Sequence, residues 1–175
     1  LLDRRLAVGG QTLDIQGLAA RYTDVFLPVH GVHQAHNAAV AVAAVEAFLG
    51  DGRRPVNGEV LATAMEAVTT PGRLELVRTA PTVFVDAAHN PAGMAALTVA
   101  IREVTDFERL IAVVGVLADK PAETMLGELE PLVAEVVITT SSSPRAIPPE
   151  QLADIAREVF GEDRVHCAPR LDDAI

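Results

Sequence analysis

Leu110-Ile-Ala-Val-Val-Gly-Val116 is an unbroken apolar run rich in β-branched residues. It is too short for a helix, and its composition is typical of a strand that is buried on both faces of a sheet. Helical periodicity flanks the run, over Pro91–Val104 before it and Pro121–Val133 after it. Because a helix between two strands returns the chain across the same sheet, this alternation predicts βαβ crossovers. The run therefore predicts an α/β fold with a mainly parallel, doubly wound sheet.

The same alternation continues on either side of this segment. Strands are predicted at Leu74–Arg78, Thr82–Val85, Glu135–Thr140 and Arg164–Cys167, and a further helix at Pro149–Phe160. Each strand is short and each helix is long enough to cross the sheet, so the pattern describes one α/β domain with flanking helices.

The N-terminal part of the chain follows a different pattern. Alternating residues around Gly9-Gly10 predict a β-hairpin, and Tyr22–Leu27 predicts a third strand. The Ala-rich run Asn37–Leu49 predicts a helix that is buried nearly all round. Asn57 is the predicted N-cap of a second helix. We therefore expect the tail of one domain here, built from a hairpin and helices.

A domain boundary is predicted at Thr69-Thr-Pro-Gly72, where turn-forming residues interrupt the helical pattern. Residues 1–68 then form the end of one domain and residues 69–175 form most of another. Leu1 stands in place of an initiator Met and the sequence stops abruptly at Ile175, which leads us to expect a piece of a longer protein.

Composition excludes several classes of protein. The 175 residues are 50% hydrophobic and 22% charged, which is typical of a packed globular core and not of a disordered chain. A net charge of −10 without a basic stripe argues against a nucleic-acid partner. The longest apolar stretch, Asn37–Gly50, carries Glu46 and is too short to span a bilayer. Cys167 is the only cysteine, which excludes an intrachain disulfide and fits a reducing cytoplasm.

The segment Val83-Phe-Val-Asp86-Ala-Ala-His89-Asn90-Pro91 is the most informative candidate site. Parallel sheets bind ligands beyond the carboxyl ends of their strands, and Asp86 ends a predicted strand. A carboxylate there can accept both ribose hydroxyls of a nucleotide, while His89 and a helix N-terminus at Asn90 suit anionic groups. The alternative is that Asp86 and Asn90 only cap turns and that His89 is a solvated loop residue.

A second cluster contains His30, His33 and His36 next to Asn37. Two histidines three residues apart can share a helix face, but the third points about 120° away, so we expect no metal site. Asn37 suits the recognition of an amide-like edge such as that of adenine. Its structural alternative is a helix N-cap.

Two single cationic residues, Arg73 and Lys120, are further candidates for ligand binding. Arg73 follows a Pro-Gly turn at the predicted boundary, where it can reach a terminal phosphate, although an ordinary linker arginine is the alternative. Lys120 is the only lysine and lies between a strand end and a helix start, so it is either a carboxylate or phosphate ligand or a surface charge.

These segments together resemble one family. The chain contains, in order, Gly31-Val-His33-Gln34-x-x-Asn37, Pro71-Gly72-Arg73, Asp86-Ala-Ala-His89-Asn90-Pro91, Gly115-Val-Leu-x-Asp119-Lys120 and Ser143-Pro-Arg145-Ala. This ordered set is similar to the folylpolyglutamate synthase/dihydrofolate synthase branch of the Mur ligase superfamily, particularly its actinobacterial members. The block from Asp86 to Pro91 is fairly specific, because peptidoglycan-building Mur ligases usually carry other residues there.

The resemblance implies a fold and a set of roles. Residues 1–68 would be the C-terminal part of a central ATPase domain, and residues 69–175 a Rossmann-like C-terminal domain. The implied nucleotide ligands are Asn37 at adenine, Asp86 at ribose and Arg73 at the terminal phosphates. His89 and Asn90 would line the phosphate and amino-acid site, with Arg73 and His89 as the catalytic pair, and Lys120 would hold the carboxylate of the incoming amino acid. Pro121 departs from the acidic residue that many relatives have there.

The implied activity is ATP-dependent ligation of L-glutamate to folate, and possibly to dihydropteroate, through an acyl phosphate. ATP and Mg²⁺ are the implied cofactors, with most Mg²⁺ ligands and the phosphate-binding loop expected outside this chain. The implied protein is a cytoplasmic monomer whose partners are small molecules, and this piece alone is expected to be inactive. The alternatives are a peptidoglycan-type Mur ligase and a non-catalytic nucleotide-binding domain.

Overall fold

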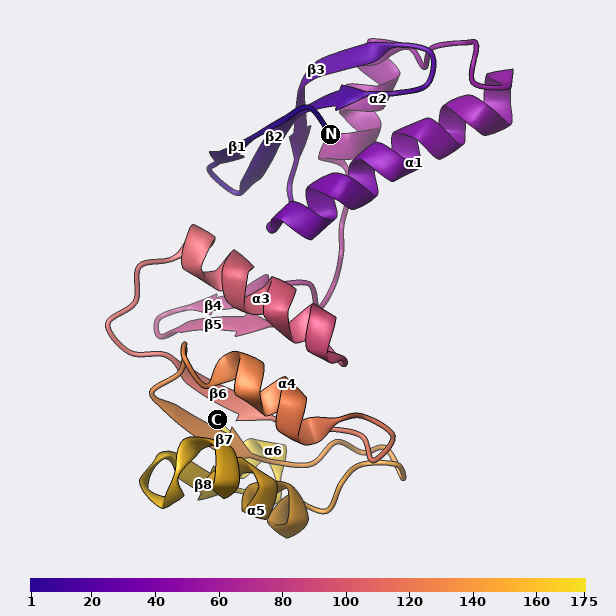
Figure 1. Ribbon diagram of the computed structural model, residues 1–175. Helices are drawn as coiled ribbons and strands as arrows, with labels where there is room; N and C mark the ends of the chain where they lie inside the picture. Colours follow the sequence, from indigo (N-terminus) through magenta and orange to yellow (C-terminus); the bar gives the residue numbers. More distant parts are fainter. The chain divides into compact units, whose positions relative to one another are not determined.

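The computed structural model describes residues 1–175, which form two compact units, Leu1–Ala87 and Ala88–Ile175 (Figure 1). The first unit contains β1 (Asp3–Ala7), β2 (Gly10–Gln16), β3 (Arg21–Leu27), α1 (Val32–Gly50), α2 (Gly58–Glu66), β4 (Glu75–Thr79) and β5 (Thr82–Val85). The second contains α3 (Pro91–Val104), β6 (Ile111–Val114), α4 (Ala122–Leu129), β7 (Glu135–Ile138), α5 (Pro149–Phe160), a 3₁₀ turn (Glu162–Arg164), β8 (Val165–Cys167) and α6 (Leu171–Ala174). The assignment of residues 1–68 and 69–175 to different domains stays a prediction, since the compact units divide after Ala87.

The first unit is built on an antiparallel sheet in the order β1-β2-β3. The hairpin predicted around Gly9-Gly10 is confirmed, because β1 and β2 pair with Ala7 opposite Gly10. Alternate residues of β2 face inward, and Leu13 and Ile15 are fully buried. They pack with α1 and α2 into a core that also contains Tyr22, Val25, Leu27, Val29, Ala35, Ala38, Val42, Leu61 and Met65.

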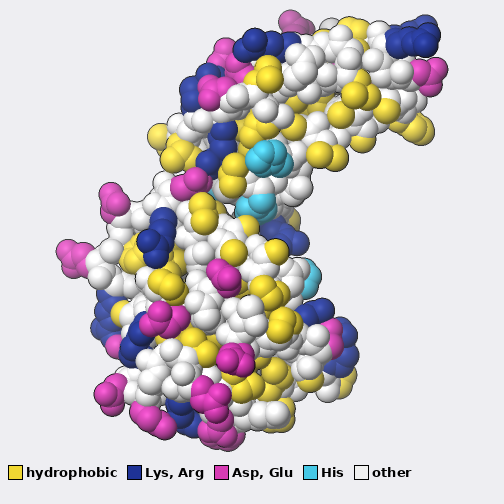
Figure 2. Space-filling model, in the orientation of Figure 1, with side chains coloured by type: hydrophobic (Ala, Val, Ile, Leu, Met, Phe, Trp, Pro, Cys, Tyr) yellow, Lys and Arg dark blue, Asp and Glu magenta, His cyan; other side chains and the backbone are white.

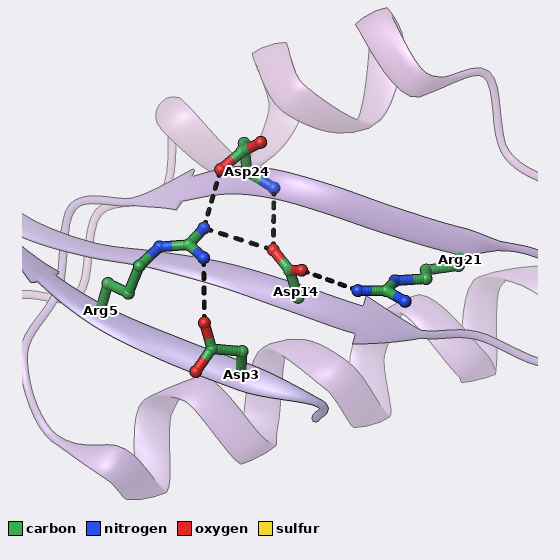
Figure 3. Close-up of polar contacts among 5 residues, drawn as sticks. All are labelled: Asp3, Arg5, Asp14, Arg21 and Asp24. Atoms are coloured by element: carbon green, nitrogen blue, oxygen red, sulfur yellow. Dashed lines mark hydrogen bonds and ion pairs between the residues drawn. The ribbon is translucent and has the colours of Figure 1, made fainter.

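An ion-pair network joins the three strands of this sheet (Figure 3). The Asp14 carboxylate accepts hydrogen bonds from the backbone N–H of Asp24 at 3.2 Å and from Arg21 at 3.0 Å. Arg5 bridges Asp14, Asp24 and Asp3. The Asp24 N–H and the Arg21 guanidinium lower the pKa of Asp14 below its usual range, with Arg5 adding to the effect. Asp14 thereby holds the irregular register between β2 and β3.

Helix α1 corrects two of the sequence predictions. It begins at Val32, so Asn37 lies inside the helix and is not its N-cap. The helix buries only one face, formed by Ala35, Ala38, Val42 and Glu46. The prediction of a helix buried nearly all round was therefore wrong: Val40 and Phe48 are 68% and 88% exposed, and Figure 2 shows hydrophobic side chains along this helix. Because Ala and Val occupy both faces, hydrophobicity alone does not distinguish them.

Glu46 is a buried carboxylate that ties three segments together. Its Oε2 accepts hydrogen bonds from the backbone N–H groups of Leu18 and Ala19, and its Oε1 accepts one from the Tyr22 hydroxyl at 2.7 Å. The Tyr22 hydroxyl in turn accepts the N–H of Val56 at 2.7 Å. Glu46 thus joins α1 to the turn between β2 and β3 and to the segment that leads into α2.

The two helix starts predicted from asparagine are confirmed. The Asn57 side chain accepts the N–H groups of Glu59 and Val60 at the start of α2. Asn90 accepts the N–H of Gly93 at 2.8 Å at the start of α3, where Pro91 occupies the first turn. Both side chains satisfy backbone donors that the first helical turn leaves without partners.

The second unit contains the predicted parallel sheet, in the order β6-β7-β8. The prediction that Leu74–Arg78 and Thr82–Val85 belong to this sheet was wrong, because these strands, β4 and β5, pair antiparallel with each other as a separate hairpin of the first unit. The expectation that residues 110–116 are buried on both faces was wrong, since Ile111 and Val113 are 46% and 40% exposed. Ala112 and Val114 pack against the core on the other face.

Helices α4 and α5 cover this sheet and supply the centre of its core, with Leu126, Leu152, Ala153 and Ala156 fully buried. Arg164 holds the segment that follows α4. Its guanidinium donates to the carbonyls of Glu130, Val133 and Ala134 and pairs with the Glu130 carboxylate at 2.6 Å. None of the helices has both the length and the apolar character needed to cross a membrane.

Candidate functional site

The hairpin β4–β5 brings Asp86 to the turn that carries Arg73. Because β4 follows this turn and β5 precedes Asp86, antiparallel pairing places the two next to each other. The Asp86 Oδ2 accepts the backbone N–H of Leu74 at 2.7 Å, and the N–H of Ala87 donates to the Gly72 carbonyl at 2.8 Å. The carboxylate predicted as a ribose ligand therefore also has a structural contact.

This contact stabilises an unfavourable backbone conformation. Gly72 and Leu74 have φ values of 69° and 45°, in the left-handed region that glycine tolerates and a bulky residue such as leucine rarely adopts. The turn is held further by the Gly72 N–H, which donates to Glu75 Oε2 at 2.8 Å, and by the Arg73 N–H, which donates to the Thr70 carbonyl at 3.1 Å. Strained backbone that its surroundings hold in place is typical of functional segments.

Arg73 itself is exposed, and its guanidinium forms no ion pair within this chain. Four hydrogen bonds thus define the backbone around an exposed side chain. The Arg73 guanidinium is therefore carried by a backbone of fixed conformation, which suits the binding of an anionic group.

Helix α3 carries the next two candidates. Asn90 is its N-cap, so its side-chain oxygen is engaged with the helix backbone, as the structural alternative for this residue predicted. His89 is exposed and immediately precedes the cap. The N-terminus of a fourteen-residue helix attracts negative charge, so His89 lies where an anion is favoured.

Lys120 follows β6 and belongs to a small charged cluster. Its Nζ lies 2.8 Å from the Asp119 carboxylate, and Arg145 Nη1 lies 3.6 Å from the other oxygen of Asp119. The Lys120 ammonium is the main reason that the pKa of Asp119 lies below its usual range. One carboxylate thus holds two cations side by side, which leaves the cluster with a net positive charge.

Backbone hydrogen bonds bring these charges together. The loop after β6 and the loop after β7 pair with each other, because Ala118 donates to the Arg145 carbonyl at 2.8 Å and Ile147 donates to the Val116 carbonyl at 2.9 Å. The contact between Asp119 and Arg145 is not evident from the sequence. The usable signal was that both loops follow adjacent parallel strands, whose carboxyl ends share one edge.

In the serine-rich loop after β7, two serine hydroxyls accept hydrogen bonds from backbone N–H groups of the same loop. Ser141 Oγ accepts the N–H of Ser143 at 3.3 Å, and Ser143 Oγ accepts the N–H of Arg145 at 3.2 Å. Thr139, at the end of β7, is 5% exposed, and its hydroxyl has no hydrogen-bond partner. The loop therefore orients Arg145 and leaves one buried hydroxyl at the strand end.

Asn37 is exposed on α1, one turn after Gln34, and its Nδ2 donates to Gln34 Oε1 at 3.3 Å. His36 contacts the Val32 carbonyl at 3.0 Å through Nδ1. In the structure, no three His, Cys, Asp or Glu side chains form a group that would hold a metal ion.

The fold is an α/β domain whose candidate polar residues follow strand ends, preceded along the chain by an antiparallel sheet with two helices. Residues 72–175 match the family model described as Mur ligase, glutamate ligase domain, and the chain belongs to this family. It is 52% identical over 176 residues to the dihydrofolate synthase/folylpolyglutamate synthase of Mycobacterium tuberculosis. The matched region covers all of this chain and 36% of that relative.

Solved structures agree with this comparison. The folylpolyglutamate synthase of M. tuberculosis complexed with ADP superposes with a TM-score of 0.95 at 51% identity, over 99% of this chain and 38% of that one. The folylpolyglutamate synthase of Thermotoga maritima gives a TM-score of 0.74 at 26% identity, over 92% of this chain and 37% of that one. The chain thus spans little more than a third of the length of these relatives.

Proposed function

We propose that the full-length protein is a cytoplasmic, ATP-dependent ligase that adds L-glutamate to folate and also to dihydropteroate. The observation that carries the proposal is the likeness, along essentially this whole chain, to a folylpolyglutamate synthase complexed with ADP. The hydrogen-bonded turn supports it, because it brings the backbone on either side of Arg73 next to Asp86, so that both residues belong to one small segment of the fold.

The proposed chemistry solves a specific problem, which is that a carboxylate is a poor electrophile. Transfer of the γ-phosphoryl group of ATP to the folate carboxylate forms an acyl phosphate and ADP. The glutamate amine then attacks the acyl carbon, and phosphate leaves from the tetrahedral intermediate to give the amide. The protein contributes by positioning the reactants and by stabilising charge, and Mg²⁺ would neutralise phosphate charge. We assign no Mg²⁺ ligand to this chain.

We assign the nucleotide to three residues of the first unit. Asn37 offers an exposed amide for the edge of adenine, and the carboxylate of Asp86, which follows β5, would accept the ribose hydroxyls. Arg73 would stabilise the terminal phosphates while phosphoryl transfer takes place.

We assign the amino acid to the second unit. Lys120 would bind a carboxylate of glutamate, and Arg145, held on the same Asp119, adds a second cation for a ligand that has two carboxylates. His89 would lie at the departing phosphate, and Asn90 would hold the start of α3 next to it.

A substrate panel on the full-length protein tests this proposal. We expect ATP-dependent phosphate release with glutamate plus a folate or dihydropteroate, and none with a UDP-linked muramyl peptide plus its amino acid. Turnover only with the muramyl substrate would assign the protein to the peptidoglycan-building ligases. Nucleotide binding without turnover on either substrate would favour a non-catalytic domain.

Asp86→Asn separates the two roles of this carboxylate. The asparagine oxygen still accepts the Leu74 N–H, but an N–H₂ group replaces the second acceptor. We expect KM for ATP to rise about tenfold, since a hydrogen bond to a charged group is lost, while the melting temperature stays nearly unchanged. Steady-state kinetics and a thermal melt measure the two effects.

Asp86→Ala removes both contacts, so it should also lower the melting temperature. Asp106→Asn, an exposed aspartate outside the site, serves as the control and should change neither quantity. An unchanged KM for ATP together with a lower melting temperature in Asp86→Asn would make Asp86 a purely structural residue.

A further inference from the structure

Gln11 is a fully buried polar side chain on β2, the central strand of the first sheet. Its Nε2 donates to the carbonyl of Val29 at 2.8 Å and to the carbonyl of Gly31 at 3.2 Å. Its Oε1 accepts a hydrogen bond from Arg4 Nε. Two carbonyls on one side and a guanidinium on the other fix which end of the amide is nitrogen. Every strong polar atom of this side chain is therefore engaged.

The two carbonyls lie where the chain enters α1. Gly31 is the N-cap of this helix, and no side chain of its own first turn caps it. The Gly31 carbonyl also accepts the N–H groups of Gln34 at 3.1 Å and of Ala35 at 3.4 Å. Gln11 thus holds the same carbonyl that starts the helical hydrogen-bond pattern.

Packing alone holds this end of α1 weakly. The buried residues of its first two turns are Ala35 and Ala38, which offer little side-chain surface, whereas the C-terminal part has Val42 and the hydrogen-bonded Glu46. Hydrogen bonds from β2 therefore determine where the first turns of α1 lie.

We infer that Gln11 is a positioning residue for nucleotide binding. It acts through Asn37, which lies on α1 less than two turns beyond the Gly31 carbonyl that Gln11 holds. This inference rests on the proposed role of Asn37 at adenine. Displacement of a binding group by a fraction of an ångström weakens binding strongly, so the position of this helix end controls affinity.

The test uses ADP binding to the full-length protein, measured by isothermal titration calorimetry. Gln11→Met keeps the length of the side chain and removes both donors, and we expect the dissociation constant to rise on the order of tenfold. Gln11→Asn keeps the amide but shortens its reach, which gives a milder variant if the methionine variant does not fold. Gln16→Met is the control: Gln16 lies at the other end of β2 and donates to the carbonyls of Gly17 and Ala20.

A double-mutant cycle with Asn37→Ala distinguishes positioning from general destabilisation. If Gln11 acts through Asn37, the double variant binds ADP no more weakly than Asn37→Ala alone. Additive losses, or a lower melting temperature with unchanged ADP affinity in both Gln11 variants, would overturn the inference. Unchanged affinity in Asn37→Ala would instead refute the proposed adenine contact, and that variant reports it independently of Gln11.

Discussion

Arg73→Ala in the full-length protein is expected to lower kcat by about 10²–10³, with little effect on folate binding. The backbone around Arg73 is defined by four hydrogen bonds, while its guanidinium is exposed and forms no ion pair in this chain. In the proposed role, this cation would stabilise charge that develops on the phosphoryl group during transfer more than it stabilises bound substrate. Steady-state kinetics with a folate titration separates the two effects.

Arg78→Ala is the matched control for this experiment. Arg78 lies on β4 of the same hairpin, is exposed, and donates through Nε to the Ala80 carbonyl at 3.1 Å. We expect it to leave kcat within about twofold of the original value, as for surface changes in general. Turnover close to the original in Arg73→Ala as well would return Arg73 to the role of an ordinary linker residue.

Glu46→Ala is expected to destabilise the protein by about 3 kcal/mol or more. The substitution removes a fully buried carboxylate and leaves the Leu18 and Ala19 N–H groups and the Tyr22 hydroxyl without their acceptor. Glu46→Gln keeps the shape and one acceptor, so its effect should be smaller. Thermal unfolding by differential scanning calorimetry measures both.

The contribution of the Glu46 carboxylate to the stability of the fold decreases as the pH falls. Burial alone would raise the pKa of Glu46, but the Tyr22 hydroxyl and the backbone N–H groups of residues 18–20 outweigh it and hold the pKa below its usual range. Because the pKa is lower in the folded state, the carboxylate contributes its full stability above about pH 4.3, and this contribution is lost as the pH falls through the folded value.

The difference in melting temperature between the original protein and Glu46→Gln should therefore shrink on acidification. Glu66 is an exposed glutamate on α2, and Glu66→Gln should have the same melting temperature as the original protein at neutral pH. Equal melting temperatures of the Glu46 and Glu66 variants would contradict the structural role of the buried carboxylate.

Local sequence signals predicted most of the elements correctly, because each depends on a few neighbouring residues. Gly9-Gly10 marked the hairpin turn, and Asn57 and Asn90 marked helix starts, since a side-chain acceptor next to free N–H groups works within four residues. The alternation of strands and helices predicted the parallel β6-β7-β8 sheet for the same reason.

The exposed faces of the elements and the pairing of charges distant in sequence were decided only by the tertiary structure. The Ala/Val composition of α1 has no period that reveals its exposed face, and the apolar run at residues 110–116 does not show which face of β6 is uncovered. Residues 119 and 145 lie far apart in sequence, and only two adjacent parallel strands bring their charges within 3.6 Å.

The sequence by itself therefore determined most of the helices and strands, the caps at Asn57 and Asn90, and the motifs that resemble a ligase family, because such information is local or ordered along the chain. The tertiary structure alone decided that Glu46 and Gln11 are buried, that Asp86 supports the turn of Arg73, and that Asp119 joins two cations. These contacts join residues distant along the chain, and their energies depend on burial and distance, which no local pattern of side chains specifies.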